Sequence, residues 1–187
     1  MMLPSFLLIL LQVCSLQLMV AARPSCRLRA DLVQSAHQLL LDLGGDFPVR
    51  CLPYNANISF PVSIFSPAAV NQPQCCRALW VVYESMQKAE TIFLNNELPV
   101  GEGGVTWDNK TLDDFQNMQD QLVEEGKYLA SIDNSGALTP YFHNLTAVLQ
   151  QQDGASCGWM ALRRDLIRVL KSALHNHRAC LTWRHAH

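Results

Sequence analysis

Apolar residues recur every three or four positions through five stretches of this chain, and that spacing constrains the fold more than any other feature. Such spacing is typical of amphipathic α-helices. We expect helices at about 26–43, 75–95, from 109 onward, from 139 onward and at about 156–177. No strand pattern competes with them, and there is no internal repeat. The sequence therefore predicts an all-α protein with five helices, four of them long.

Residues at the helix ends agree with these boundaries. Gly44-Gly45 is predicted to end the first helix, because glycine accepts the left-handed conformation at a helix C-terminus. Thr111 and Asp114 resemble a capping box at the start of the third helix. Thr139-Pro140 is typical of an N-cap hydroxyl followed by proline at the first helical position.

The connection between the first two helices is long and rich in proline. It carries Pro48, Pro53, Pro61, Pro67 and Pro73, so we expect no long helix within it. With about thirty residues, it can cross the full length of a bundle, and a long crossover permits parallel neighbours. This favours an up-up-down-down bundle over a simple up-down-up-down arrangement.

The N-terminus predicts secretion. An apolar run begins at Phe6, and Val20 and Ala22 suit a signal-peptide cleavage site, although no Lys or Arg precedes the run. Residues 1–22 are thus predicted to be removed, leaving residues 23–187 as one domain with no later membrane span. Three N-glycosylation acceptor triplets agree with secretion, at Asn57, Asn109 and Asn144.

The cysteines predict a disulfide framework. Loss of Cys14 with the signal peptide leaves an even set in an oxidising compartment, where cysteines pair. The set is Cys26, Cys51, Cys75, Cys76, Cys157 and Cys180. The sequence alone leaves the pairing open.

Catalysis and metal binding find little support. The chain has no Cys-x-x-Cys, no Gly-x-Ser-x-Gly, no His-Glu-x-x-His and no phosphate loop. His175 and His177 near Cys180, with His185 and His187 at the end, invite a metal site, yet two histidines separated by one residue cannot share a helix face. We expect no enzyme, metal or cofactor.

Charge is distributed unevenly along the chain. The net charge of −2 argues against nucleic acid as a partner. Residues 84–125 hold ten acidic and two basic residues, whereas 157–187 hold six basic and one acidic. This pattern predicts different surfaces for different partners, with plain solvated helix faces as the alternative.

The last helix separates an apolar side from a basic side. Taking Trp159 as zero and about 100° per residue, the apolar residues lie within about 80° of it. They are Leu162, Leu166, Val169, Leu170 and Ala173. Arg164, Arg168 and Lys171 lie on the far side, bordered by Met160 and Ile167. Such a mixture favours a protein-binding surface over an ordinary polar face.

Several motifs occur in an order that resembles one family. Cys157-Gly-Trp159, opening a basic amphipathic helix, resembles the Cys-Ala-Trp that begins the last helix of type I interferons. Cys51-Leu52 with Phe60-Pro61, Gln87 to Ile92, and Trp107-Asp108 with Thr111-Leu112 and Phe115 are similar to other strings of that family. The likeness covers essentially the whole mature chain and is that of a non-mammalian branch.

The cysteine pattern departs from the family. The cysteine that usually partners the N-terminal one is replaced by Leu129, and Cys75, Cys76 and Cys180 are additional. In an up-up-down-down bundle, the end of the first helix and the start of the last share one pole, so Cys51 should bond Cys157. The remaining four cysteines should gather at the opposite pole, with their pairing open.

The resemblance implies a secreted antiviral cytokine, expected to be monomeric, that joins two chains of a heterodimeric class II cytokine receptor. Matching motifs place one receptor face on Leu52, Arg163, Arg164, Ile167, Arg168 and Lys171. Asn55 stands where the family often has arginine. The second receptor chain should meet the second and third long helices. Alternatives are another secreted helical cytokine, or a saposin-like lipid-binding protein.

Overall fold

The computed structural model describes residues 26–65, 71–99, 101, 103–133 and 135–183. The predicted signal peptide, residues 1–22, lies outside the described residues, as do His185 and His187. The elements in chain order are β1 (Leu28–Arg29), α2 (Ala30–Asp42), η1 (Val49–Cys51), α3 (Leu52–Asn55), η2 (Val62–Ile64), α4 (Gln72–Asn95), α5 (Asn109–Gly126), η3 (Lys127–Ser131), α6 (Thr139–Leu149), α7 (Ala155–Asn176), η4 (Arg178–Cys180) and β2 (Leu181–Thr182), where η marks a 3₁₀ helix.

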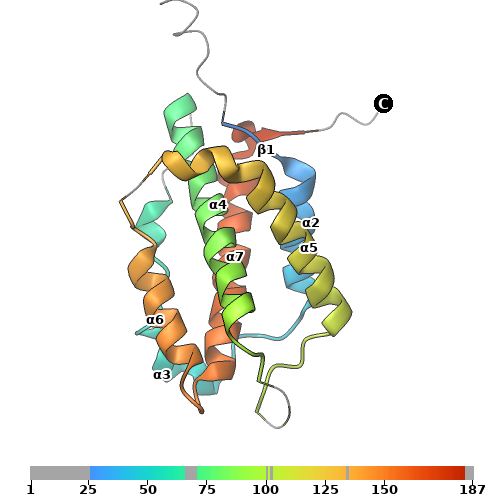
Figure 1. The fold of residues 1–187 in the computed structure, drawn as a ribbon, viewed down its shortest axis with the longest axis vertical. Coiled ribbons are helices and arrows are strands. Elements are labelled where there is room, and N and C mark those ends of the chain that lie inside the picture. The colour runs from blue at the N-terminus through green and yellow to red at the C-terminus, as the bar shows by residue number, and fades with distance from the viewer. Residues whose placement is uncertain (1–25, 66–70, 100, 102, 134, 184–187) are drawn as a thin grey trace, which may run out of the picture.

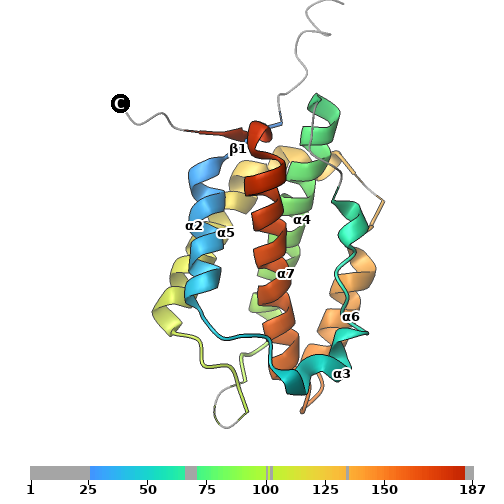
Figure 2. The ribbon, with the colours of Figure 1, turned by 180° about the vertical axis from the view of Figure 1, so that it is seen from behind.

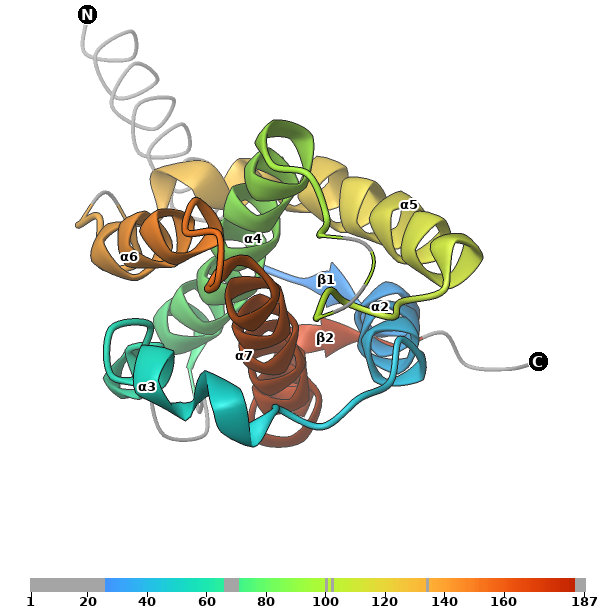
Figure 3. The same cartoon turned by 90° about the horizontal axis from the view of Figure 1, so that it is seen from below.

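The four long helices form an up-up-down-down bundle, which confirms the predicted fold class. α2 and α4 run in one direction, and α5 and α7 run in the other (Figure 1). Both α2 and α4 pack against α5 and α7, so that each long helix has antiparallel neighbours. α6 packs against α7 on the side away from α2, as the view from below shows (Figure 3).

The long connection crosses the bundle as its length predicts. From the end of α2 it crosses the outer side of α7 near the lower end of that helix, forms η1 and the short helix α3, and then rises beside α6 to η2 (Figure 2). One boundary was wrong, because Pro73 belongs to α4 and not to the connection. Proline fits the first helical turn, where its missing N–H needs no partner. Asn71 caps this turn by accepting a hydrogen bond from the Gln74 N–H at 3.0 Å.

The first helix begins later than predicted. α2 starts at Ala30 instead of Cys26, and Leu28–Arg29 pair in parallel with Leu181–Thr182. The expectation of no strands is therefore wrong at these two segments. Each segment lies next to a disulfide that ends on α4, and these bonds hold the two segments side by side.

The predicted end signals had mixed outcomes. Gly44 and Gly45 end α2 with φ of 68° and 85°, as expected for left-handed residues. At α5 the N-cap is Asp108, whose carboxylate accepts the Thr111 N–H at 2.8 Å, so the predicted capping box was misplaced. Thr139 is already inside α6, which has no side-chain N-cap.

Apolar residues from every long helix meet in one core. The largest fully buried side chains include Trp80, Trp159, Phe115, Met86, Leu122 and Leu145. Gly126 lets α5 approach α4 closely, because a Cβ there would lie 2.8 Å from the ring of Tyr83. Within the described ranges, every helix is either too short or too polar to cross a bilayer.

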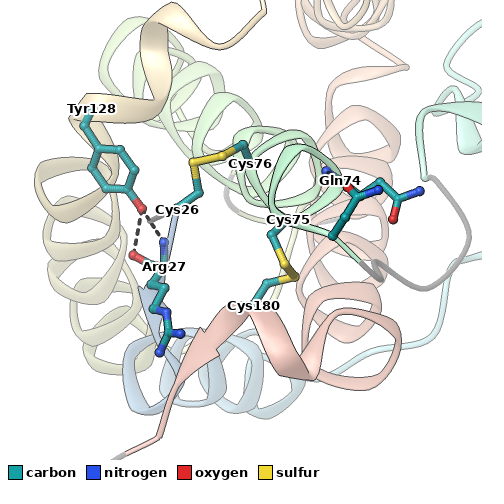
Figure 4. Close-up of a disulfide and its surroundings, with 8 residues drawn as sticks. Cys26, Arg27, Gln74, Cys75, Cys76, Tyr128 and Cys180 are labelled. Carbon is teal, nitrogen blue, oxygen red and sulfur yellow. Dashed lines mark hydrogen bonds between the residues drawn. A yellow bond between two sulfur atoms is a disulfide. The ribbon is translucent and has the colours of Figure 1, made fainter. Parts of the chain in front are cut away.

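Three disulfides join the ends of the bundle. Cys51 bonds Cys157 at the pole where α2 ends and α7 begins. At the opposite pole, Cys26 bonds Cys76 and Cys75 bonds Cys180 (Figure 4). Two consecutive cysteines of α4 thus tie down both β1 and the segment after α7. This is the grouping by poles that the topology predicts, and it resolves the pairing that the sequence left open.

Candidate functional site

The six residues predicted to form a receptor face do not all reach the surface. Leu52 is 56% exposed on α3, and Arg168 and Lys171 are exposed on α7. Ile167 is half-buried beside them. Arg164 is largely covered and Arg163 is buried. We call the exposed part the α3/α7 face, consisting of Leu52, Ile167, Arg168 and Lys171.

Arg163 is a correction to the predicted face. Its Nε donates to the Leu40 carbonyl at 2.7 Å, and one terminal nitrogen donates to the Gly45 carbonyl at 2.7 Å. The other terminal nitrogen lies 3.3 Å from the Leu41 carbonyl. The Leu40 and Leu41 carbonyls belong to the last turn of α2, and the Gly45 carbonyl belongs to the turn that follows it. Arg163 therefore caps α2 from α7 and is not available to a partner.

Arg164 joins α7 to the long connection. Its guanidinium donates two hydrogen bonds to Asp165, both at 2.8 Å, and a third to Asn55 Oδ1 on α3 at 2.6 Å. The same group lies over the ring of Phe47, 4.6 Å from its centroid. Arg164 was predicted to project into solvent, but its side chain is only 18% exposed. It holds α3 in place against α7.

Asp165 is the centre of this network. Its side chain is 1% exposed, yet it pairs with Arg164 and Arg168 and accepts a hydrogen bond from the Tyr141 hydroxyl at 3.0 Å. Burial, reinforced by the Asp165 carboxylate, raises the pKa of Tyr141 well above its usual value, so this hydroxyl stays protonated and keeps donating. The network thereby links α6, α7 and α3.

The apolar residues bordering the basic side of α7 also differ from the prediction, which named Met160 and Ile167. Met160 is buried, at 8% exposure, and its end lies beside Gly45 in the turn after α2, so it is not part of the surface. The connection supplies apolar surface instead, because Val49 and Val62 are 80% and 61% exposed. Exposed aliphatic groups therefore precede and follow α3 along the chain.

The α4/α5 side carries the opposite charge. Asp113, Asp120 and Glu124 are exposed on α5. Leu94, 79% exposed near the end of α4, lines a groove between the two helices together with Phe93 and Asp120. The acidic segment of the sequence thus forms a surface separate from the α3/α7 face.

The described residues contain no group of three or more side chains suited to holding a metal ion. His175 is exposed, whereas His177 is 3% exposed and its two ring nitrogens have no hydrogen-bond partner among the described residues. The three glycosylation acceptors, Asn57, Asn109 and Asn144, are all exposed. Their occupancy stays a prediction.

Sequence reasoning missed Asp165, Tyr141, Asn55 and Phe47 as members of the network. Asp165 had a usable signal, since it is the single acidic residue among six basic ones in 157–187. Tyr141 and Phe47 had none, because their approach to α7 depends on how α6 and the connection pack.

Comparison with known proteins agrees with this architecture. Residues 28–177 match the family described as the interferon alpha/beta domain. Interferon alpha-1 of pig (Sus scrofa) is 27% identical over 168 residues, covering 79% of this chain and 84% of that protein. Interferon alpha-A of cattle (Bos taurus) is 30% identical over 115 residues, covering 55% and 58%.

A solved structure gives the same result for the fold. Zebrafish interferon 2 has a TM-score of 0.62 and 29% sequence identity, covering 80% of this chain and 99% of that chain. The extra cysteines are accommodated as three disulfides within the interferon bundle. The chain belongs to the type I interferon family of cytokines and is not an enzyme.

Proposed function

We propose that this protein is a secreted antiviral cytokine that binds and bridges two chains of a heterodimeric class II cytokine receptor. The observation that carries the proposal is the α3/α7 face, where exposed Leu52, Arg168 and Lys171 combine apolar and basic side chains on neighbouring elements. Such a combination supplies contact energy through its apolar part and speeds encounter through its charge. This face is assigned to one receptor chain.

The face is supported by rigid contacts beneath it. The Cys51–Cys157 bond lies between the start of α3 and the start of α7, and Arg164 joins Asn55 to Asp165 about two turns further along α7. A surface that is already ordered loses less entropy on binding. Arg163 and Arg164 therefore act as positioning residues, and Arg168 and Lys171 as contact residues.

The second receptor chain is assigned to the α4/α5 side. The acidic residues and the exposed Leu94 give this side a chemistry unlike that of the α3/α7 face, which suits a different partner. With two distinct faces, one monomer can hold two receptor chains, and affinity for each chain adds through avidity on the membrane. Cleavage after Ala22 and glycans at Asn57, Asn109 and Asn144 complete the proposal.

A cell assay tests bridging directly. Mature protein, residues 23–187, is applied to cells that carry both receptor chains and to cells in which either chain is deleted, and antiviral transcripts are measured. Induction should require both chains. Induction that persists when either chain is missing would refute bridging. Binding to extracted lipid without any induction would favour the saposin-like alternative.

A further inference from the structure

The basic side of α7 continues beyond the α3/α7 face. Arg168, Lys171 and His175 are all exposed. Their spacing places them within about 60° of one another around the helix, along about 10 Å of its axis. His37 of α2 reaches the same region, where Lys171 and His175 act on its imidazole. We call these four residues the α2/α7 stripe; α2 and α7 lie side by side on this face (Figure 2).

Little negative charge opposes the stripe. Among the described residues, Lys171 and His175 form no ion pair, and the carboxylate that pairs with Arg168 is Asp165, which also neutralises Arg164. Asp42 and Asp114 line a groove on the other side of α2, toward α5. The groups acting on His37 are both basic, and burial together with these neighbours lowers its pKa. Lys171 is thus a cation without a counter-charge among the described residues, and Arg164 and Arg168 share one carboxylate, so this surface carries an excess of positive charge that attracts anions.

We propose that the α2/α7 stripe binds a sulfated glycosaminoglycan of the cell surface or extracellular matrix. Repeated sulfate groups along a linear chain match a row of lysine, arginine and histidine side chains, each of which can donate a hydrogen bond, charge-assisted from the lysine and the arginine. The assignment to an extracellular polyanion rests on the proposed secretion of the chain.

The stripe shares two residues with the proposed receptor face and extends beyond it. Because Arg168 and Lys171 belong to both, a bound polysaccharide and the receptor chain exclude each other. His37 and His175 belong to the stripe alone. Retention on the matrix and receptor engagement are therefore alternative states of one surface.

Binding to immobilised heparin tests the proposal, with hyaluronan as an unsulfated polyanion and phosphatidylserine vesicles as an anionic membrane. The double variant Lys171→Glu/His175→Glu should lose about five-fold or more in heparin affinity for each glutamate introduced. Lys110→Glu is the matched control, because Lys110 is an exposed lysine at the start of α5, away from the stripe. It should bind heparin as the wild type does.

A second variant tests the two histidines of the stripe, His37 and His175, without reversing any charge. The imidazoles of His37 and His175 can each donate a ring N–H hydrogen bond to a sulfate oxygen. His37→Ala/His175→Ala removes both donors and should weaken heparin binding at pH 7.4 while keeping its potency in the receptor assay without heparin. This variant introduces no charge, so it covers the case in which the glutamate variant fails to fold.

The outcomes are distinct. The site is supported if the wild type binds heparin but neither hyaluronan nor the vesicles, and if the stripe variants lose heparin binding. Equal heparin binding by the wild type and both stripe variants overturns it. Binding to vesicles but not to heparin also overturns it and points to a membrane surface. None of these binding measurements depends on receptor signalling, so failure of the stripe is distinguishable from failure of the proposed receptor function.

Discussion

The four basic residues between Arg163 and Lys171 of α7 divide into two halves that do different work. In the half near the Cys51–Cys157 bond, Arg163 and Arg164 turn inward and bond the end of α2, α3 and Asp165. One turn later, Arg168 and Lys171 remain exposed. The difference shows that basic residues close in sequence can serve as structural ties or as contact surface, depending on what the neighbouring chain offers them.

The largest loss of stability is expected from removing Asp165, which holds the inward half of these basic residues, Arg163 and Arg164, through its bonds to Arg164. Asp165→Ala leaves Arg164 largely buried without its carboxylate and leaves the Tyr141 hydroxyl without its acceptor. Removing one partner of a buried ion pair costs about 3–5 kcal/mol. Urea unfolding of the variant should show this loss. Asp165→Asn, which keeps an acceptor for Tyr141, is the control and should lose less. A loss under about 1 kcal/mol in the alanine variant would mean that the network is dispensable.

Replacing Arg163 should have the next largest effect. Arg163→Met keeps much of the side-chain volume but removes the three contacts to carbonyls at the end of α2. Hydrogen bonds to a charged group contribute about 1.5–3 kcal/mol, and we expect a loss in that range. Hydrogen exchange should rise at residues 43–45. If Arg163→Met instead weakens receptor binding with no change in stability or exchange, Arg163 belongs to the contact surface after all.

Acid should destabilise the opposite end of α7 to a smaller degree. Burial lowers the pKa of His177, and that of His37 is also lowered, so both are neutral in the folded protein when the unfolded chain would already bind a proton. Stability is therefore full above the unfolded pKa of about 6.5. It falls as the pH drops below that value toward each lowered folded pKa.

The measurement is the free energy of unfolding from pH 7.5 to 5. Each unit by which a folded pKa is lowered corresponds to about 1.4 kcal/mol. His177→Gln should flatten the slope below pH 6.5 relative to the wild type. An unchanged slope would show that carboxylates and other histidines account for the whole pH dependence.

Charge reversal in the outward half should change stability least. Lys171→Glu alters an exposed side chain that forms no ion pair among the described residues, and such changes usually lie within about 0.5 kcal/mol. Arg168→Glu should cost somewhat more, because Arg168 also pairs with Asp165. The same reversal at Arg164 should be far more damaging, because a glutamate there would face buried Asp165. Comparing the melting temperatures of Arg164→Glu and Lys171→Glu tests this contrast. Equal melting temperatures would remove the distinction between the two halves.

Periodicity predicted much of this structure. Spacing of apolar residues located every long helix and the buried side of α7, because burial of one stripe is what stabilises such helices. Connection length predicted the topology, and the topology predicted which cysteines share a pole. Pairing within the four-cysteine pole could not be predicted, since Cys75 and Cys76 are adjacent and both lie within reach of the same pole.

Errors at the candidate site have physical reasons. Arg163 lies about 40° from Trp159 around α7, on the buried side, so helical phase argued against the surface position that the resemblance implied. The inward turn of Arg164 depends on Asn55 and Phe47, which come from an irregular connection whose path the sequence does not specify. Met160 was placed correctly on the helix but is covered by the turn at Gly45.

Direct binding to the receptor chain tests the central claim, that the outward half of α7 is contact surface. The mature wild type, Arg168→Glu/Lys171→Glu and the control Arg27→Glu, an exposed residue near β1, are titrated against each immobilised receptor ectodomain. The double variant should fold normally, associate more slowly and bind one chain at least about ten-fold more weakly, with the other chain unaffected. Wild-type affinity of the folded double variant for both chains would contradict the account.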